Sequence, residues 1–497
     1  MKKTVFIKNA AILTVSSLIL RFAGIVFKVW LAAAIGSEGI GLYQLIFSVY
    51  MLAATLVTSG ISTAVTRLCT DELALGCARG VKKILRRSIE LTLLVSAVCT
   101  AALFFGAEPV ARLALSDMRA VSAIKILSFS LPFMGLSSCF KGYFIARRKA
   151  SPTAVSQLLE QGIRLIIVIT LVARFSHRGL AFTCGVVLLG DTVSEMASAL
   201  YLWLLYLADR RKIKDLSGRA RPPFKIVRTI CSIMAPISSG RCLNSVLRTV
   251  ESILVPKGLS AHPLSGQNAL SQFGMIKGMA LPILFFPSTL LSALSTLLIP
   301  EMSEAAARGH KAVVRSAAQR IIVITTLISI IFAAIFAVGG EKIGLLIYKS
   351  QDVGFLIKAL SPIVPFMYLD GICDGILKGL DQQKFTFRTS ISDSLIRIVL
   401  VAAVLPRFGI YGFIGIMYFS NFLTCFLNVA RLLKVSGARP DPVKGLFLPL
   451  VGAVSVTLLA DIVIRIFSLP DLVYIILLCA VCLPIYFLYL FLIGSIV

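Results

Sequence analysis

The chain has 497 residues, of which 58% are hydrophobic, and its mean hydropathy is +0.92. This composition excludes an ordinary soluble domain, because apolar runs of about 18 residues or more, each long enough to cross a bilayer core, recur along the whole chain. The formal net charge of +27 fits either a nucleic-acid partner or basic cytoplasmic loops, and the position of the charges decides between them.

The chain begins with a basic and then apolar stretch that resembles a signal peptide, MKKTVFIKNAAILTVSS. It lacks a convincing small-residue cleavage site and stays apolar to about residue 34, so we expect a retained first span. Hydropathy predicts an all-α polytopic membrane protein with about fourteen transmembrane helices. The expected spans are 8–34, 40–66, 88–106, 121–146, 153–173, 179–207, 226–256, 270–299, 317–338, 355–379, 387–405, 410–431, 445–465 and 471–495.

The basic residues are distributed unevenly between the two sides of these spans. With both termini placed in the cytoplasm, most of the 50 Lys and Arg residues lie on the inner side, and the densest cluster is at 209–225. This asymmetry is typical of membrane topology and predicts no nucleic-acid partner.

The chain contains an internal repeat at a constant offset of 233 residues, clearest between 131–165 and 364–398. The matched pairs include Pro132 with Pro365, Gly142 with Gly375, Glu160 with Asp393 and Arg164 with Arg397. The offset spans six helices, an even number, so the halves are parallel repeats related by a pseudo-two-fold axis along the membrane normal. We expect an N-lobe (1–208), a basic cytoplasmic linker (209–225), a C-lobe (226–435) and a two-helix appendix (436–497).

The first helix of each expected lobe carries two cations seven residues apart, Arg21 with Lys28 and Arg241 with Arg248. Seven residues make nearly two turns, so each pair lies on one face, about 10 Å apart along the axis. A cation at bilayer depth is costly unless it faces a wet cavity or an anion, so we predict a positive, substrate-binding cleft between the lobes. The alternatives are snorkelling of Lys28 and Arg248, and neutralisation of Arg248 by Glu251.

Other charges inside the spans fall into two groups. Glu160 with Arg164, and Asp393 with Arg397, have i,i+4 spacing and are expected to be structural ion pairs. Two acidic faces are candidates for binding a coupling Na⁺ or H⁺, and they are formed by Asp191 with Glu195 and by Asp370 with Asp374.

No motif supports an enzyme, a metal site or an organic cofactor. Most of the 11 cysteines lie in apolar spans, and the pair in CAVC (479–482) has no charged neighbour that would activate a thiol. The three histidines are scattered without ligand spacing. We expect no catalytic residues, no bound metal and no cofactor other than a coupling Na⁺ or H⁺.

Three stretches resemble one family, the stage V sporulation protein B family of polysaccharide biosynthesis proteins. They are LRFAGIVFKVWLAAAIGSEGIGLYQLIF near the start, KGYFIARRKASPTAVSQLLEQGIRL across spans 4 and 5, and SGRCLNSVLRTVESILVPKGL in span 7. The family belongs to the multidrug/oligosaccharidyl-lipid/polysaccharide exporters, which include the lipid II flippases. The resemblance covers essentially the whole chain and implies fourteen spans arranged as six, six and two.

The resemblance implies a monomeric flippase in the bacterial cell membrane that moves an undecaprenyl-pyrophosphate-linked sugar, such as a peptidoglycan precursor, to the outer leaflet by alternating access. It implies that Arg21 and the second-lobe Arg241 and Arg248 line a cationic cavity, which Lys28 matches more loosely, and that spans 13 and 14 hold part of a lipid-tail groove. The expected partners are this lipid-linked pyrophosphate and membrane lipid. The alternatives are a cation-coupled drug antiporter, a membrane-embedded transferase and a non-transporting scaffold for wall synthesis. Whether the role is in sporulation or in vegetative growth stays open.

Overall fold

The computed structural model describes residues 2–175, 179–212, 223–263, 269–467 and 469–494, and these ranges contain helices and no β-strand. Of the expected linker at 209–225, residues 213–222 lie outside the described residues. The helices, including short π and 3₁₀ turns named η, are α1 (Lys2–Thr58), α2 (Ile61–Ala74), α3 (Ala78–Phe105), α4 (Ala107–Pro109), η1 (Val110–Leu115), α5 (Ala120–Ser128), α6 (Leu131–Ala146), α7 (Ser151–Phe175), α8 (Leu180–Asp209), η3 (Arg210–Lys212), α9 (Pro223–Ser260), α10 (Ala269–Gly274), η4 (Met275–Ala280), α11 (Leu281–Phe285), α12 (Ser288–Ala307), α13 (Lys311–Tyr348), α14 (Gln351–Leu360), η5 (Ser361–Ile363), α15 (Val364–Gly379), α16 (Gln383–Ser436), η6 (Val443–Phe447), α17 (Leu448–Ile466) and α18 (Asp471–Leu492).

Nine helical segments of the described chain are long and apolar enough to cross a membrane. Two of them, Val15–Ala74 and Gln383–Ser436, contain 60 and 54 residues, and a crossing needs only about 20. Each is bent at a glycine with positive φ, Gly36 and Gly409, and each bend lies between two of the expected spans. The other expected spans coincide with helical segments, but 121–146, 270–299 and 355–379 are each divided into two or more shorter helices. The prediction of an all-α polytopic membrane protein is therefore confirmed.

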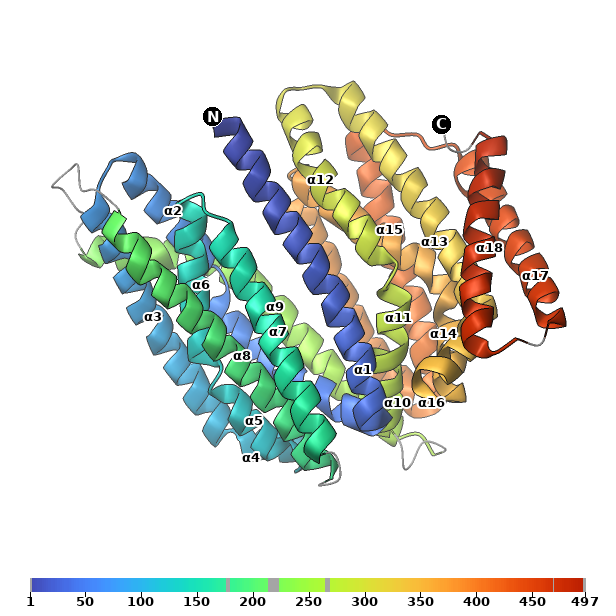
Figure 1. Ribbon diagram of the computed structural model, residues 1–497, viewed down its shortest axis with the longest axis horizontal. Coiled ribbons are helices and arrows are strands. Elements are labelled where there is room, and N and C mark those ends of the chain that lie inside the picture. The colour runs from blue at the N-terminus through green and yellow to red at the C-terminus, as the bar shows by residue number, and fades with distance from the viewer. Residues whose placement is uncertain (1, 176–178, 213–222, 264–268, 468, 495–497) are drawn as a thin grey trace. The chain divides into compact units, whose positions relative to one another are not determined.

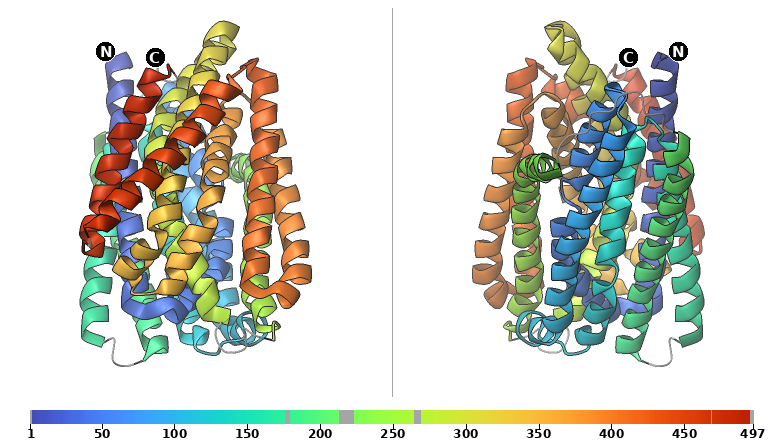
Figure 2. Two further views of the ribbon diagram at one scale, coloured as in Figure 1. Left: turned by 90° about the vertical axis from the view of Figure 1, so that its right-hand side faces the viewer. Right: turned by 90° about the vertical axis from the view of Figure 1, so that its left-hand side faces the viewer.

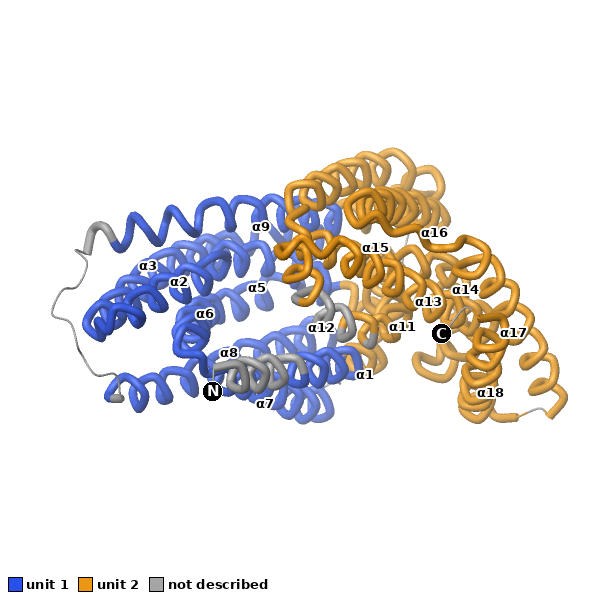
Figure 3. Tube along the Cα trace, turned by 90° about the horizontal axis from the view of Figure 1, so that it is seen from above, with its two compact units in different colours: residues 1–27, 42–253 blue, residues 28–41, 254–497 orange. Residues whose placement is uncertain are grey.

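The chain packs into two compact units (Figure 3). Unit 1 contains residues 1–27 and 42–253, and unit 2 contains residues 28–41 and 254–497. This division differs from the expected lobe boundary at 226, because most of α9 packs with unit 1. Polar side chains of α9 fix it there: the Ser238 hydroxyl donates to the Ser59 carbonyl at 2.8 Å and the Thr249 hydroxyl to the Ser48 carbonyl at 3.0 Å. The lobes defined by the repeat stay a prediction.

The core of unit 1 lies among α2, α3, α6 and α8, with α9 covering one side. Its largest buried side chains include Tyr143 and Phe144. At its edge, the Asp209 carboxylate at the end of α8 accepts a hydrogen bond from Tyr143 at 2.8 Å and pairs with Arg147 and Lys149. This buried acid is fully neutralised, so it ties the ends of α6 and α8 together. Figure 1 shows α7 and α8 side by side within this unit.

In unit 2, α13 is the central helix and contacts α14, α15, α17 and α18. The hydroxyl of buried Tyr486 on α18 donates to the Leu327 carbonyl of α13 at 3.3 Å. Cys482 is buried in the same apolar cluster, as expected for a packing residue. Figure 2 shows the two halves of α16 folded back beside each other, and Ser420 bonds to Asp393 across this bend at 2.5 Å.

Two glycines that the repeat matches, Gly41 and Gly274, lie against each other in unit 2. A Cβ on Gly274 would lie 1.9 Å from the Ser37 carbonyl oxygen and 2.8 Å from the Gly41 nitrogen, and a Cβ on Gly41 would lie 2.2 Å from the Leu270 carbonyl oxygen. The backbones of α1 and α10 therefore touch, which only residues without a side chain permit. Next to this crossing the Ser37 and Ser271 hydroxyls share a 2.6 Å hydrogen bond.

We predict that Gly274→Ala lowers the stability of the purified protein, because overpacking costs about 1–3 kcal/mol and backbone atoms cannot move aside cheaply. The measurement is the thermal unfolding midpoint in detergent. Gly415→Ala is the matched control, since a Cβ at this helical glycine meets nothing within 4 Å. Equal midpoints for Gly274→Ala and the control would contradict the close approach.

Candidate functional site

Three of the four cations predicted to bind substrate belong to unit 1. Arg21 on α1 and Arg241 and Arg248 on α9 are all exposed. No described side chain forms an ion pair or hydrogen bond with these three guanidinium groups. Arg248 in particular does not pair with Glu251, whose side chain is only 5% exposed. The three guanidinium groups are therefore accessible to a ligand.

Lys28 is also exposed, but it lies on the stretch of α1 that packs with unit 2. The structure thus groups Arg21, Arg241 and Arg248 in one compact unit and assigns Lys28 to the other. Its expected contribution to the same site stays a prediction.

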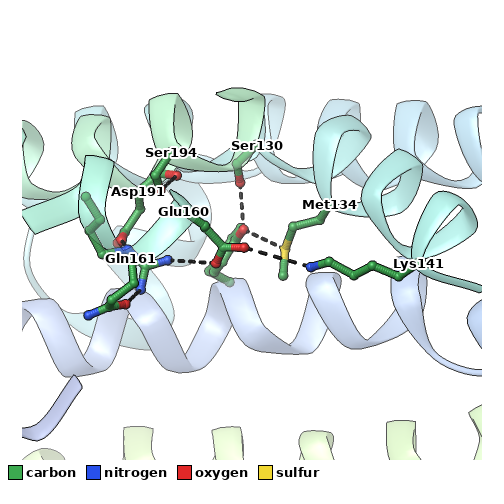
Figure 4. A network of polar contacts seen from close by, with 9 residues as sticks. Ser130, Met134, Lys141, Glu160, Gln161, Asp191 and Ser194 are labelled. Atoms are coloured by element: carbon green, nitrogen blue, oxygen red, sulfur yellow. Dashed lines mark hydrogen bonds and ion pairs between the residues drawn. The ribbon is translucent and has the colours of Figure 1, made fainter. Parts of the chain in front are cut away.

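A second polar site in unit 1 is a mixed-charge cluster formed by residues of α6, α7 and α8, which we call cluster 1 (Figure 4). Its charged members are Lys141, Glu160, Arg164, Asp191 and Glu195. Arg164 lies between two acids, with its Nε 2.6 Å from Asp191 Oδ1 and its Nη2 3.4 Å from Glu160 Oε1. Lys141 Nζ lies 3.9 Å from Glu160 Oε2. The expected pair between Glu160 and Arg164 therefore forms within α7. The contacts of these two residues with Lys141 and Asp191 extend the cluster to α6 and α8.

The two acids of α8 differ in their contacts. Asp191 is only 4% exposed and pairs with Arg164, while its Oδ2 has no hydrogen-bond partner among the described residues. Glu195 is 7% exposed, and within the described chain it forms no ion pair. With all five groups ionised, cluster 1 has three negative and two positive charges, so a bound proton or monovalent cation would neutralise it.

Sequence reasoning missed Lys141 as a member of cluster 1. The repeat contains the signal for this residue, because Lys141 matches position 374, which is also charged but is the acidic Asp374. A charged residue at the same place in both repeats points to a polar site rather than to an isolated side chain.

Unit 2 has a corresponding cluster on α15 and the two halves of α16, which we call cluster 2. Asp393 Oδ2 lies 3.9 Å from Arg397 Nη1, and Asp393 also accepts the hydrogen bond from Ser420. Asp370 Oδ1 accepts a hydrogen bond from the amide of Asn428 at 2.8 Å. The expected pair between Asp393 and Arg397 therefore forms, and Asp370 is held by a neutral partner.

Asp374 does not join Asp370 in a shared acidic pair. Its Oδ2 lies 2.5 Å from Lys378 Nζ in an i,i+4 ion pair, and the Lys378 side chain is 54% exposed. The carboxylate of Asp374 is thus neutralised by its own helix.

The repeat relates the two clusters position by position. At the offset of 233, Asp191 matches Thr424 and Glu195 matches Asn428. Both second-repeat side chains are buried, and both are neutral. The carboxylates of α8 are therefore replaced in unit 2 by a hydroxyl and an amide, and the acid is supplied by the partly buried Asp370 of α15 instead.

The donor sets limit what these clusters can bind. Within the described ranges, no three His, Cys, Asp or Glu side chains are grouped as for a metal ion. Carboxylate, amide and hydroxyl oxygens are hard donors, which suit a proton or an alkali cation rather than a transition metal.

Comparisons with known proteins agree with this architecture. A family model described as polysaccharide biosynthesis protein matches residues 6–305, and one described as MatE matches residues 236–402. Stage V sporulation protein B of Bacillus subtilis (strain 168) is 27% identical over 442 residues, which are 88% of this chain and 85% of that protein. Lipid II flippase MurJ of the same organism is 20% identical over 458 residues, 86% of this chain and 82% of that protein.

A solved structure of lipid II flippase MurJ, in an inward closed conformation, has a TM-score of 0.71 at 14% identity and covers 96% of this chain and 97% of that one. This likeness supports the helical membrane fold. The first family model matches more than half of this chain, so the chain belongs to the polysaccharide biosynthesis protein family. It is a membrane transporter of the multidrug/oligosaccharidyl-lipid/polysaccharide exporter superfamily.

Proposed function

We propose that this transporter is a flippase of the bacterial cell membrane that moves an undecaprenyl-pyrophosphate-linked peptidoglycan or polysaccharide precursor from the inner to the outer leaflet by alternating access. The observation that carries the proposal is the exposure of Arg21, Arg241 and Arg248 on α1 and α9, the helices of two predicted spans, with no acid among the described side chains to neutralise them. In this proposal both termini lie in the cytoplasm.

A pyrophosphate is the ligand that such a set of cations suits best. Guanidinium groups bind phosphate oxygens through two parallel hydrogen bonds, and they stay charged at any physiological pH. Hydrocarbon around an unpaired guanidinium is unfavourable, so the three arginines favour a hydrated site that an anionic head group can enter. The lipid tail of the cargo needs no such site, because it can remain in the membrane.

We propose that cluster 1 couples transport to Na⁺ or H⁺. Its excess acid and the unpaired carboxylate of Glu195 provide a place for one monovalent cation or proton. Occupation of Glu195 changes the charge balance around Arg164, which links α7 to α8. Cluster 2 is a weaker candidate, since Asp374 is paired and Asp370 already accepts a hydrogen bond from Asn428.

A second candidate function is cation-coupled drug export. The buried acids Asp191 and Glu195 favour it, because a cationic drug needs an acidic site, and the MatE family model also matches part of the chain. The three accessible arginines argue against it, since they would repel a cationic cargo.

We predict that Arg21→Ala/Arg241→Ala weakens binding of lipid II to the purified protein by more than about 100-fold, because each arginine contributes at least about 1.5 kcal/mol through charge-assisted hydrogen bonds. The measurement is a binding titration with lipid II, its monophosphate analogue and a cationic dye. Arg228→Ala is the control, since it removes an exposed arginine from the same helix α9.

Wild-type binding that depends on the pyrophosphate and is lost in the double variant supports the flippase. Equal binding by the double variant would make the arginines structural and contradict the proposal. Binding of the dye alone would favour the antiporter and direct attention to Asp191 and Glu195.

We also predict that Glu195→Gln abolishes the dependence of transport on an ion gradient while leaving lipid II binding unchanged, because the amide cannot take up a charge. The measurement is transport of labelled lipid II in proteoliposomes under an imposed Na⁺ or pH gradient. Asp352→Asn is the control, since it removes an exposed carboxylate from the first turn of α14. If Glu195→Gln responds to both gradients like the wild type, coupling at cluster 1 is wrong.

A further inference from the structure

A cavity of about 1180 Å³ lies in unit 2, and no residue of either polar cluster lines it. Its walls come from the end of α12, the first part of α13 and the end of α16, together with Leu380 after α15. None of the residues proposed above for cargo or ion binding lines it. The cavity therefore needs an explanation of its own.

Four basic side chains line this cavity: Lys311, Arg315, Arg320 and Lys434. All four are exposed, and no described side chain forms an ion pair or hydrogen bond with them. Its described lining contains no Asp or Glu. Four uncompensated cations around one space attract an anion with several oxygens, and a phosphate group has oxygens for both Arg forks and Lys ammonium groups.

The first repeat provides an internal comparison. Arg320 matches Arg87, whose Nη1 lies 2.6 Å from Glu90 Oε2, and the neighbouring Arg86 pairs with the same acid at 2.9 Å. The position of Glu90 is Val323 in the second repeat, and Val323 lines the cavity. The second repeat therefore keeps the cation and lacks the acid that neutralises it.

The cavity changes in character along α13. Lys311 and Arg315 stand one turn apart at the start of the helix, and Val323, Ile324 and Leu327 line the cavity further along. At a rise of about 1.5 Å per residue, the basic residues at the start of α13 are separated along the helix axis from the apolar residues that follow. The head group of a lipid and the beginning of its acyl chains would together span this distance. A free phosphate ion would use only the charged part.

From this geometry we propose that the cavity binds the phosphate head group of an anionic membrane phospholipid, with Lys311, Arg315, Arg320 and Lys434 around the phosphate and the upper acyl chain against Val323 and Leu327. The predicted topology places this end of α13 at the cytoplasmic leaflet, where anionic lipids attract basic side chains. None of the proposed cargo arginines lines this cavity, so in this proposal the bound lipid is a resident of the transporter and not its cargo.

The test is a calorimetric titration of the full-length protein in neutral detergent with dihexanoylphosphatidylglycerol. The wild type is expected to bind it saturably, and Lys311→Gln/Arg315→Gln to bind it about 25-fold more weakly, since each surface cation is worth about 1 kcal/mol or about fivefold. The matched control is Lys384→Gln/Arg388→Gln, an exposed Lys and Arg with the same i,i+4 spacing outside the cavity. The control is expected to bind like the wild type.

A second variant, Val323→Glu, places in the second repeat the acid that neutralises Arg87 in the first. It is expected to weaken phosphatidylglycerol binding without removing any cation. Equal affinity for dihexanoylphosphatidylcholine would show that the anionic charge is not recognised, and equal affinity for inorganic phosphate would identify a soluble anion as the ligand. Either result overturns the proposal.

Lipid II is titrated in parallel to separate this site from the cargo site. The Lys311→Gln/Arg315→Gln variant is expected to bind lipid II like the wild type, even if the cargo arginines prove to have no role. Loss of lipid II binding in this variant would make the cavity a docking site for cargo and would overturn its assignment to a resident phospholipid.

Discussion

The ion pair between Arg164 and Asp191 compensates the charges of two side chains inside unit 1, and it joins α7 to α8. A charge inside a membrane bundle needs a counter-charge, a hydrogen-bonding partner, water or a ligand. The 2.6 Å contact between these side chains supplies the counter-charge across two helices, and Lys141 and Glu160 extend it to a third. Helices α6, α7 and α8 can therefore carry five ionisable residues in spans that are otherwise apolar.

The same requirement explains how the charges of the two repeats have diverged. Where α8 has Asp191 and Glu195, the second half of α16 has Thr424 and Asn428, and the acid has moved to Asp370. Conversely, Glu90 neutralises arginines of the first repeat, while Val323 leaves the matching arginine of the second repeat without an acid. Matched positions of the two repeats thus hold different charge sets, and a cation that has an acid beside it in the first repeat has none among the described residues of the second.

Most of the helical architecture could be predicted from the sequence, because a span is a local property of about 20 residues. The bends at Gly36 and Gly409 lie between expected spans, and the pairs formed by Glu160 with Arg164 and Asp393 with Arg397 follow from i,i+4 spacing alone. The inclusion of Lys141 and Asp191 in one cluster, and the packing of α9 with unit 1, depend on contacts between distant helices. Hydropathy and residue spacing contain no information about those contacts. The repeat shows only which positions of the two halves correspond, not which helices touch.

The contact between Gly41 and Gly274 makes the two positions depend on each other. Each glycine is enclosed by backbone atoms of the other helix, so neither helix can take up a side chain on this face while the other stays in place. A replacement at Gly41 therefore cannot be compensated by a smaller residue at position 274, because glycine is already the smallest residue there. The crossing of α1 and α10 is thus a place where neither position can vary to make room for the other.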